Sequence, residues 1–273
     1  YQIKPPLPFV PGIEAVGTVV EVGSQSKYKI GDRIATTGIG AFGEKMAAQD
    51  SMTFLVPPGM NNVDAAAIRI IYETSYMAIK YKAQMQPGEV LLVHGGAGGV
   101  GTSAIQVGKA LGGMVIATAT GERDIKVCFD TGADHVIDWQ NEDIVTRVKE
   151  LTDGRGADVI YDPVGGDAFD ASTHCINFEG RLIVIGFASG RIPEIKGHMI
   201  LNKNMSVMGF FWTNYLFKRP DLVDDYQDEI NRLYLEGKFP PVVSAVLPMT
   251  DLPKSLDMIT NRDAYGKIVL VNE

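Results

Sequence analysis

Short apolar segments interrupted by glycine and proline characterise the first 72 residues. Residues 16–22 form a β-branched run between glycines and residues 33–36 form a second run, so both are expected to be strands. Pro57, Pro58 and Gly59 interrupt the chain before a helix that the pattern predicts at residues 64–71. The pattern therefore indicates β-rich structure with too few strands to close a barrel.

From about residue 88 the pattern alternates between strands and helices. Residues 90–93 form a continuous apolar run of the kind that is buried on both faces of a parallel sheet. Further strands are predicted at residues 115–119, 136–137, 159–161, 182–185 and 206–210. Helices are predicted at residues 102–111, 122–131, 141–152 and 167–178. Such alternation predicts parallel βαβ units, and six strands favour a doubly wound α/β sheet.

The pattern changes again near Pro220. A charged helix is predicted at residues 221–236, followed by Pro240 and Pro241 and by a last strand at residues 267–271. Because the first region has too few strands to close a barrel, this C-terminal segment is expected to return and complete it.

Composition excludes several classes of protein. The 273 residues carry a formal charge of −8 without a basic cluster, which argues against a nucleic-acid partner. Two cysteines, Cys128 and Cys175, cannot form a disulfide scaffold or a cysteine-rich metal site. No apolar run reaches the roughly 20 residues that a spanning helix needs, so a cytoplasmic protein is expected. The chain starts at Tyr1 in a proline-rich stretch, and we expect it to be a fragment.

The strongest chemical signal is a glycine-rich loop between the strand at residues 90–93 and the following helix. Gly96, Gly98 and Gly101 fit the spacing G-x-G-x-x-G. Gly96 is expected to allow a tight turn, Gly98 to let backbone amides approach a pyrophosphate, and Gly101 to allow close contact between helix and strand. The helix would point its positive end at the phosphates. A flexible glycine turn is the alternative, but the strand and helix on either side favour dinucleotide binding.

The end of the next strand bears on which dinucleotide is bound. An NAD site usually places a carboxylate at this tip, whereas here the strand ends at Thr118, Ala119 and Thr120. Arg123 follows in the next helix, and a guanidinium pairs well with a 2′-phosphate. The sequence thus favours NADPH over NADH, with a solvated Arg123 as the alternative.

Together these segments resemble the medium-chain dehydrogenase/reductase superfamily, in its zinc-free quinone oxidoreductase (zeta-crystallin-like) branch. The resemblance covers almost the whole chain and rests on the order and spacing of short segments at residues 11–14, 17, 20–23, 31–33, 72–76, 97–101, 132–134, 162–166, 180–181, 185–187, 209–212 and 266–267. It implies a Rossmann domain with a six-stranded parallel sheet at residues 73–215. Residues 1–72 and 216–273 would form a partial GroES-like β-barrel domain that binds the substrate, and the segment that precedes Tyr1 in the family would be missing.

Zinc-dependent members of the superfamily carry a Gly-His-Glu phrase and a lobe with four cysteines. Here the phrase reads Gly12-Ile13-Glu14 and the cysteine lobe is absent. The resemblance therefore implies no metal, and Glu14 is expected to be a structural carboxylate beside a turn.

The resemblance also assigns roles to single residues. Thr74 resembles a threonine beside the cofactor at the domain junction, and Tyr72 resembles an aromatic near the substrate, with a plain core tyrosine as the alternative. Gly98, Gly99, Val100 and Gly101 match the diphosphate loop.

At the adenosine end the sequence departs from the family. Family members often have Ser and Lys for the 2′-phosphate where this chain has Gly121 and Asp124, so the NADPH preference depends on Arg123. Trp139 takes the place of a tyrosine against the adenine, or else covers a strand end.

Three residues are assigned to the nicotinamide end. Phe187 and Phe211 resemble residues whose backbone flanks the nicotinamide carboxamide, with core aromatics as the alternative. Lys267 resembles a lysine near the cofactor, with an ordinary exposed charge as the alternative.

The expected function is hydride transfer from NADPH to quinones or other conjugated carbonyl compounds, a reaction that needs a dry, well-oriented cleft more than a general acid. A reductase of 2-alkenals, enones or enoyl thioesters, a non-catalytic NADPH-binding protein and an interaction scaffold remain as alternatives. Residues 205–211 are expected to form an edge strand, and the resemblance implies a homodimer joined at this edge.

Overall fold

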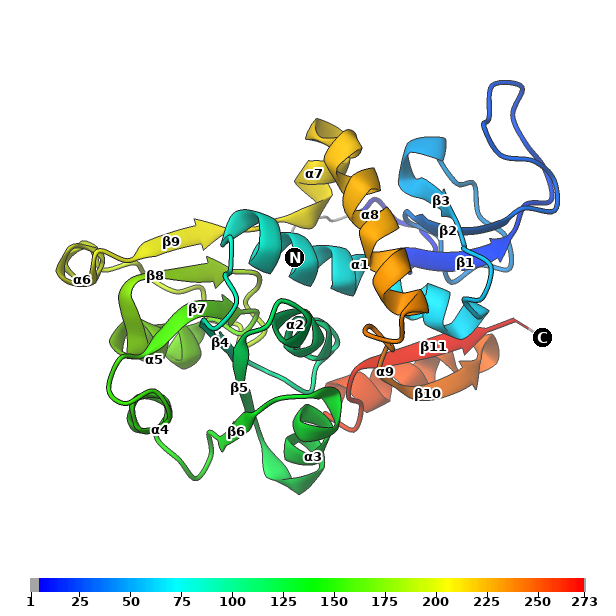
Figure 1. Ribbon diagram of the computed structural model, residues 1–273. Coiled ribbons are helices and arrows are strands. Elements are labelled where there is room, and N and C mark those ends of the chain that lie inside the picture. Colours follow the sequence, from blue (N-terminus) through cyan, green and yellow to red (C-terminus); the bar gives the residue numbers. More distant parts are fainter. Residues whose placement is uncertain (1–4, 273) are drawn as a thin grey trace.

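A computed structural model describes residues 5–272, so Tyr1, on which the expectation of a fragment rests, lies outside the described residues. Its described part is built around a six-stranded parallel sheet with the order β6-β5-β4-β7-β8-β9 (Figure 1). These strands are β4 (Val90–Val93), β5 (Met114–Ala119), β6 (His135–Asp138), β7 (Ala157–Asp162), β8 (Ile176–Val184) and β9 (Ser206–Gly209). The doubly wound sheet expected from the sequence is therefore confirmed.

Both faces of this sheet are covered by helices, as the apolar run of β4 predicts. Leu91 and Val93 point into one hydrophobic cluster, and Val90 and Leu92 point into another on the opposite face. The first face carries α1 (Asn62–Tyr76), α2 (Gly99–Ala110) and α3 (Gly121–Thr131). The second face carries α4 (Ile144–Leu151), α5 (Gly166–Cys175) and α6 (Gly197–Lys203).

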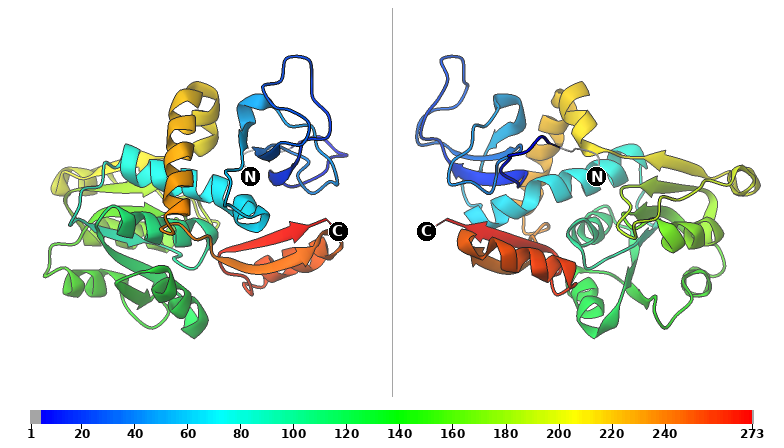
Figure 2. Two further views of the ribbon diagram at one scale, coloured as in Figure 1. Left: turned by 45° about the vertical axis from the view of Figure 1, so that its right-hand side comes forward. Right: turned by 180° about the vertical axis from the view of Figure 1, so that it is seen from behind.

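A smaller lobe combines the two ends of the chain (Figure 2). Its antiparallel sheet contains β1 (Glu14–Thr18), β2 (Arg33–Thr37) and β3 (Thr53–Leu55), and a second, parallel sheet pairs β10 (Val243–Pro248) with β11 (Lys267–Val271). The C-terminal segment thus returns to the N-terminal one as expected. It does not complete a barrel, however, because within residues 5–272 no strand pairing joins the two sheets, and a hollow of about 1790 Å³ lies between them.

The first helix runs well beyond its expected end at residue 71. It continues to Tyr76 and then passes into a π-helix at Met77–Lys82. All residues from Ile71 to Ile79 are buried, and such uniform burial has no amphipathic period from which the end of a helix can be read.

Several other boundaries differ from the expectations. The strand expected at residues 16–22 ends at Thr18, and Val20 and Val22 are exposed. Helix α5 ends at Cys175 because β8 begins directly at Ile176, which shortens the helix expected at 167–178. Helices α6 and α7 (Trp212–Lys218) were not expected. The remaining helices are α8 (Pro220–Leu235), α9 (Leu252–Thr260) and two 3₁₀ turns at Asp50–Met52 and Met249–Asp251.

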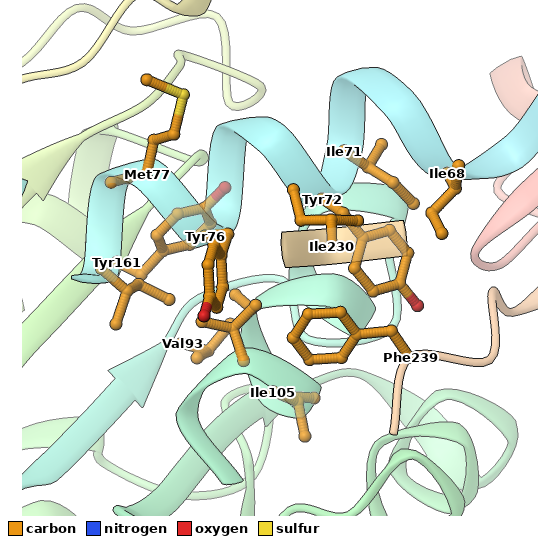
Figure 3. Close-up of a cluster of buried hydrophobic side chains, with 14 of the residues drawn as sticks. Ile68, Ile71, Tyr72, Tyr76, Met77, Val93, Ile105, Tyr161, Ile230 and Phe239 are labelled. Atoms are coloured by element: carbon orange, nitrogen blue, oxygen red, sulfur yellow. The ribbon is translucent and has the colours of Figure 1, made fainter. Parts of the chain in front are cut away.

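An aromatic cluster anchors α8 and the loop that follows it to α1 (Figure 3). The ring of Phe239 lies 5.2 Å from that of Tyr72 and 5.7 Å from that of Tyr76. Phe239 and Ile230 are fully buried in this cluster. Because α8 belongs to the chain segment that returns to the smaller lobe, the cluster fixes the C-terminal segment to the centre of the molecule.

We predict that Phe239→Ala lowers the free energy of unfolding by about 3–5 kcal/mol, since the substitution leaves a cavity among side chains that cannot collapse into it. Urea unfolding followed by circular dichroism measures the change. Phe217, which is 67% exposed on α7, provides the matched control, and Phe217→Ala should change stability by less than about 0.5 kcal/mol. Equal losses for both variants would contradict this description of the core.

Candidate functional site

The glycine-rich loop connects β4 to α2 and sits at the carboxyl end of the central strand. Helix α2 is capped by Gly98, and its first turn leaves the backbone amides of Gly99, Val100 and Gly101 without partners inside the helix. A Cβ atom on Gly101 would lie 2.1 Å from the carbonyl oxygen of Gly95. Only a glycine therefore lets the first turn of α2 lie directly on the loop, which presents an array of amides that suits an anion.

The glycines of the loop serve the turn and the packing together. The amide of Gly98 donates to the carbonyl of Gly95, so Gly96 lies inside a tight turn as expected, while Gly95 itself has a φ of +62° in the left-handed region. Gly96 is also required for packing, since a Cβ there would lie 2.7 Å from Sγ of Cys128 and 2.8 Å from Cβ of Ala117. The close approach expected at Gly101 is observed as well.

A buried histidine, His94, belongs to a chain of hydrogen bonds that ends on the glycine-rich loop. His94 Nε2 lies 2.8 Å from Ser172 Oγ, which itself donates to the carbonyl of Ala168, so the imidazole donates through Nε2. Its Nδ1 then accepts from the hydroxyl of Thr118 at 3.3 Å, and the same hydroxyl oxygen accepts from the amide of Gly95. Burial lowers the pKa of His94, which keeps the ring neutral and this chain of hydrogen bonds intact.

Helix α1 lies against the first turn of α2. The hydroxyl of Ser75 contacts the carbonyl of Val100 at 3.1 Å, and the hydroxyl of Ser103 contacts the carbonyl of Ile71 at 3.0 Å. Thr74, which is 7% exposed, is the neighbour of Ser75 on this helix. The role expected for Thr74 beside the cofactor stays a prediction, since adjacent residues of a helix point in different directions.

Lys267 approaches the loop from β11. A Cβ atom on Gly99 would lie 3.4 Å from Cδ of Lys267, so the lysine stem covers the loop. The ammonium group lies 2.7 Å from Glu14 Oε2, and Glu14 Oε1 accepts from the amide of Ile70 in α1. Glu14 thus joins β1, α1 and β11, and it directly follows the bend at Ile13, which agrees with the structural carboxylate beside a turn that was expected.

A second group of expected residues lies at the carboxyl ends of β5 and β6. Thr120 follows β5, and its hydroxyl accepts from the indole Nε1 of Trp139 at 2.5 Å. Trp139 follows β6 and is 43% exposed. The indole thus stands partly exposed at the tip of the sheet, a position that fits both of its expected roles.

Arg123 lies in the first turn of α3, close to the same tip, and its guanidinium is already engaged. It donates to the carboxylate of Asp124 and to the backbone carbonyls of Arg262 and Asp263, and it lies 5.9 Å from the ring centre of Tyr265. Sequence reasoning missed this approach of residues 262–265, because no local pattern links them to a helix that lies far away in the chain.

Phe187 and Phe211 follow β8 and β9 and are 39% and 43% exposed. Their exposure argues against core aromatics and agrees with a position along the ligand-binding edge of the sheet. The ring of Phe187 lies against the turn after β7, because a Cβ on Gly165 would be 3.3 Å from its Cδ1.

Tyr72 is the expected site residue that the structure does not bring to the surface of a cleft. It is fully buried, and its hydroxyl donates to Gln106 Oε1 at 2.6 Å. Burial raises the pKa of this phenol, which therefore stays protonated. Tyr72 is therefore the core tyrosine that was expected as the alternative to an aromatic near the substrate, because the neighbouring Phe239 fills the space beside its ring.

Two further findings concern metal binding and membrane spans within residues 5–272. No group of three or more His, Cys, Asp or Glu side chains in this part of the chain could hold a metal ion, and Cys128 and Cys175 are both free and buried. None of its helices combines the length and the apolar character needed to cross a membrane.

Comparison with known proteins places these features in a family. The profile described as "Alcohol dehydrogenase GroES-like domain" matches residues 1–58, and the profile described as "Zinc-binding dehydrogenase" matches residues 99–233. The chain is 36% identical to a quinone oxidoreductase-like protein 2 homolog from Nematostella vectensis, over 99% of this chain and 75% of the relative. It is 31% identical to the mouse quinone oxidoreductase-like protein 2, over 99% of this chain and 78% of that protein.

Solved structures agree with this assignment. Escherichia coli quinone oxidoreductase complexed with NADPH is 28% identical and superimposes with a TM-score of 0.92, over 99% of this chain and 84% of that one. A probable oxidoreductase from Mycobacterium abscessus is 34% identical with a TM-score of 0.90, over 99% of this chain and 82% of that one. The chain therefore belongs to the medium-chain dehydrogenase/reductase superfamily, among its quinone oxidoreductase-like proteins.

Proposed function

We propose that this protein binds NADPH and transfers its hydride to quinones or other conjugated carbonyl compounds. The observation that carries the proposal is the set of amides at the start of α2, which Gly101 allows to lie directly above the carboxyl end of β4. The E. coli relative, a quinone oxidoreductase, is complexed with NADPH in its solved structure, which supports the same assignment.

The residues around the loop indicate on which side of β4 each half of the dinucleotide would lie. Strand β4 has β5 and β6 on one side and β7, β8 and β9 on the other, so the chain changes its winding direction at the loop. Thr120 and Trp139 stand on the β5–β6 side and would receive the adenosine half. Phe187 and Phe211 stand on the β8–β9 side, where the nicotinamide half would lie, and Thr74 and Lys267 flank the pyrophosphate between them.

The proposed reaction asks little of charged side chains. NADPH, when bound, supplies the hydride, and the chain holds the acceptor beside the nicotinamide and excludes water from the cleft. We assign residues 73–215 to cofactor binding and residues 1–72 and 216–273 to the substrate lobe. Lys267 then lies where the two parts meet, since its side chain lies beside Gly99 at the start of α2.

We predict that Gly101→Ala abolishes NADPH binding, because the added methyl group collides with Gly95 and displaces the first turn of α2. Fluorescence titration of purified protein with NADPH measures the loss. Gly197 begins α6 and has open space around its Cα, so Gly197→Ala is the matched control and should bind normally. Normal binding by both variants would refute the loop as the dinucleotide site.

The acceptor is tested by following NADPH oxidation with a panel that contains a quinone, an enone and an enoyl thioester. Turnover of the quinone supports the proposal, and faster turnover of the enone or thioester would transfer the assignment to reductases of activated double bonds. NADPH binding without oxidation by any acceptor would identify a non-catalytic NADPH-binding protein.

We expect NADPH to bind more tightly than NADH, because no carboxylate ends β5 and Arg123 lies nearby. Arg123→Ala should raise the Kd for NADPH about tenfold, the loss of one charge-assisted contact, and leave the Kd for NADH unchanged. Lys126→Ala on the same helix is the control, since Lys126 is paired with Asp130 at the surface. Equal affinities of the unmodified protein for both cofactors would remove the basis for a phosphate site.

We also propose a homodimer joined through β9. Within residues 5–272 this strand pairs with β8 alone, so one of its edges remains open. Sedimentation velocity should then give about twice the chain mass of 29.6 kDa. A single-chain mass over the whole range of concentrations would rule the dimer out.

A further inference from the structure

A buried ion pair lies on the side of α1 that faces α7 and β3. Arg69 and Glu73 are one helical turn apart, with Arg69 Nε 3.4 Å from Glu73 Oε1, and they are 4% and 0% exposed. The other carboxylate oxygen of Glu73 accepts from the indole Nε1 of Trp212. Charged side chains are rarely placed so deeply without a specific partner, so this group needs an explanation.

Arg69 connects the pair to the smaller lobe. Its NH1 group donates to the carbonyl of Met52 at 3.1 Å, and its guanidinium carbon lies 4.6 Å from the ring centre of Phe54 in β3. The ring of Trp212 lies 6.0 Å away on another side. Through Arg69 and Glu73, helix α1 therefore holds β3 and the start of α7 at the same time.

The hydrogen bonds of the pair are incomplete. Within the described residues Arg69 Nε and Glu73 Oε1 have no hydrogen-bond partner, although they face each other. The indole is thus the neutral hydrogen-bond partner of the carboxylate, and its bond to a charged acceptor is of the strong, charge-assisted kind.

Trp212 is the first residue of α7 and directly follows a short connection that carries an expected nicotinamide contact. Strand β9 ends at Gly209, and the amide of Phe210 donates to the carbonyl of Val184 at the end of β8. Helix α7 starts at Trp212 (Figure 1). Phe211 therefore lies between one residue fixed by the sheet and one fixed by Glu73.

We infer that Glu73 is a positioning residue, which holds Trp212 and thereby sets the backbone of Phe211 against the nicotinamide half of the bound cofactor. The inference rests on the proposed function, since it presupposes that a dinucleotide lies across the carboxyl ends of the strands. It adds to that function that the Arg69–Glu73 ion pair determines where the nicotinamide ring lies, although the pair itself contacts no ligand.

The test separates the two halves of the cofactor. Adenosine 2′,5′-bisphosphate carries the adenosine and its phosphates and lacks the nicotinamide, so it reports on the glycine loop and the adenosine side alone. Isothermal titration of NADPH and of this fragment gives the ratio of the two affinities for each variant.

Trp212→Phe removes the N–H donor and leaves the Arg69–Glu73 pair in place. We expect this variant to bind NADPH about tenfold more weakly and to change its affinity for the fragment less than twofold. Glu229→Gln is the matched control, because Glu229 also forms an ion pair, with Lys80, and within the described residues it makes no hydrogen bond to Phe210, Phe211 or Trp212. The control should leave both affinities unchanged.

A pH profile distinguishes positioning from simple packing. Burial raises the pKa of Glu73 to about 7, Arg69 opposes this shift, and Glu14 and Asp224 add to it from β1 and α8. Because the carboxyl is charged above this pH and neutral below it, its hold on the indole weakens as the pH falls through about 7. The Glu73→Gln variant supplies the reference at each pH, because the terminal 5′-phosphate of the fragment titrates at about pH 6 and the pyrophosphate of NADPH does not. Relative to that variant, the NADPH-to-fragment affinity ratio of the unmodified protein should be smaller at pH 6 than at pH 8.

Glu73→Gln should retain only the pH dependence that the 5′-phosphate of the fragment brings to the ratio, since the amide still accepts from the indole but does not titrate. The protonation of Glu73 should also be visible without any ligand, as a change in the fluorescence of Trp212. In a Trp139→Phe background the emission should titrate with a midpoint near pH 7, and the additional Glu73→Gln substitution should remove this titration.

The outcomes separate the two proposals. If the unmodified protein binds both ligands, but Trp212→Phe weakens them equally or not at all, the positioning role is overturned and the proposed function stands. If the unmodified protein binds neither ligand, the dinucleotide site itself is overturned, and the role of Glu73 with it.

Discussion

The contact between Gly101 and Gly95 is the constraint on which the rest of the site depends. A Cβ at position 101 would come within 2.1 Å of the Gly95 carbonyl, so the helix can start directly above the strand only because no side chain is present. Because of this close approach, the free amides at the start of α2 lie just above the carboxyl end of the central strand. His94 and Thr118 hold the loop from below through uncharged hydrogen bonds, so that the amide array is fixed before any ligand arrives.

Helix α1 joins this loop to the remainder of the molecule. One side of the helix meets the first turn of α2 through Ser75 and Ser103, and another packs on the aromatic ring of Phe239. Glu14 reaches the same helix from β1 and pairs with Lys267 from β11. Segments from both ends of the chain thus converge on one buried helix, which also contacts the helix that follows the loop.

Buried charge is concentrated at this helix. Arg69 and Glu73 lie inside the protein, where separating them from water costs free energy that their attraction offsets only in part. Replacing such a pair with apolar residues is often neutral or stabilising, so stability alone does not account for it. The contacts of the pair with β3 and α7 connect it to both lobes, which agrees with a role in holding them in register.

The sequence by itself determined the parallel sheet, its six strands and the glycine loop, because a run such as Leu91–Val93 and the spacing of Gly96, Gly98 and Gly101 record local burial and local geometry. Only the tertiary structure decided which distant groups meet. It placed Tyr72 in the core, brought residues 262–265 to Arg123, and left the two small sheets unpaired within residues 5–272. The physical reason is that strand and helix periodicities depend on neighbours in the chain, whereas contacts such as Glu73–Trp212 join residues far apart in sequence and leave no pattern in either segment.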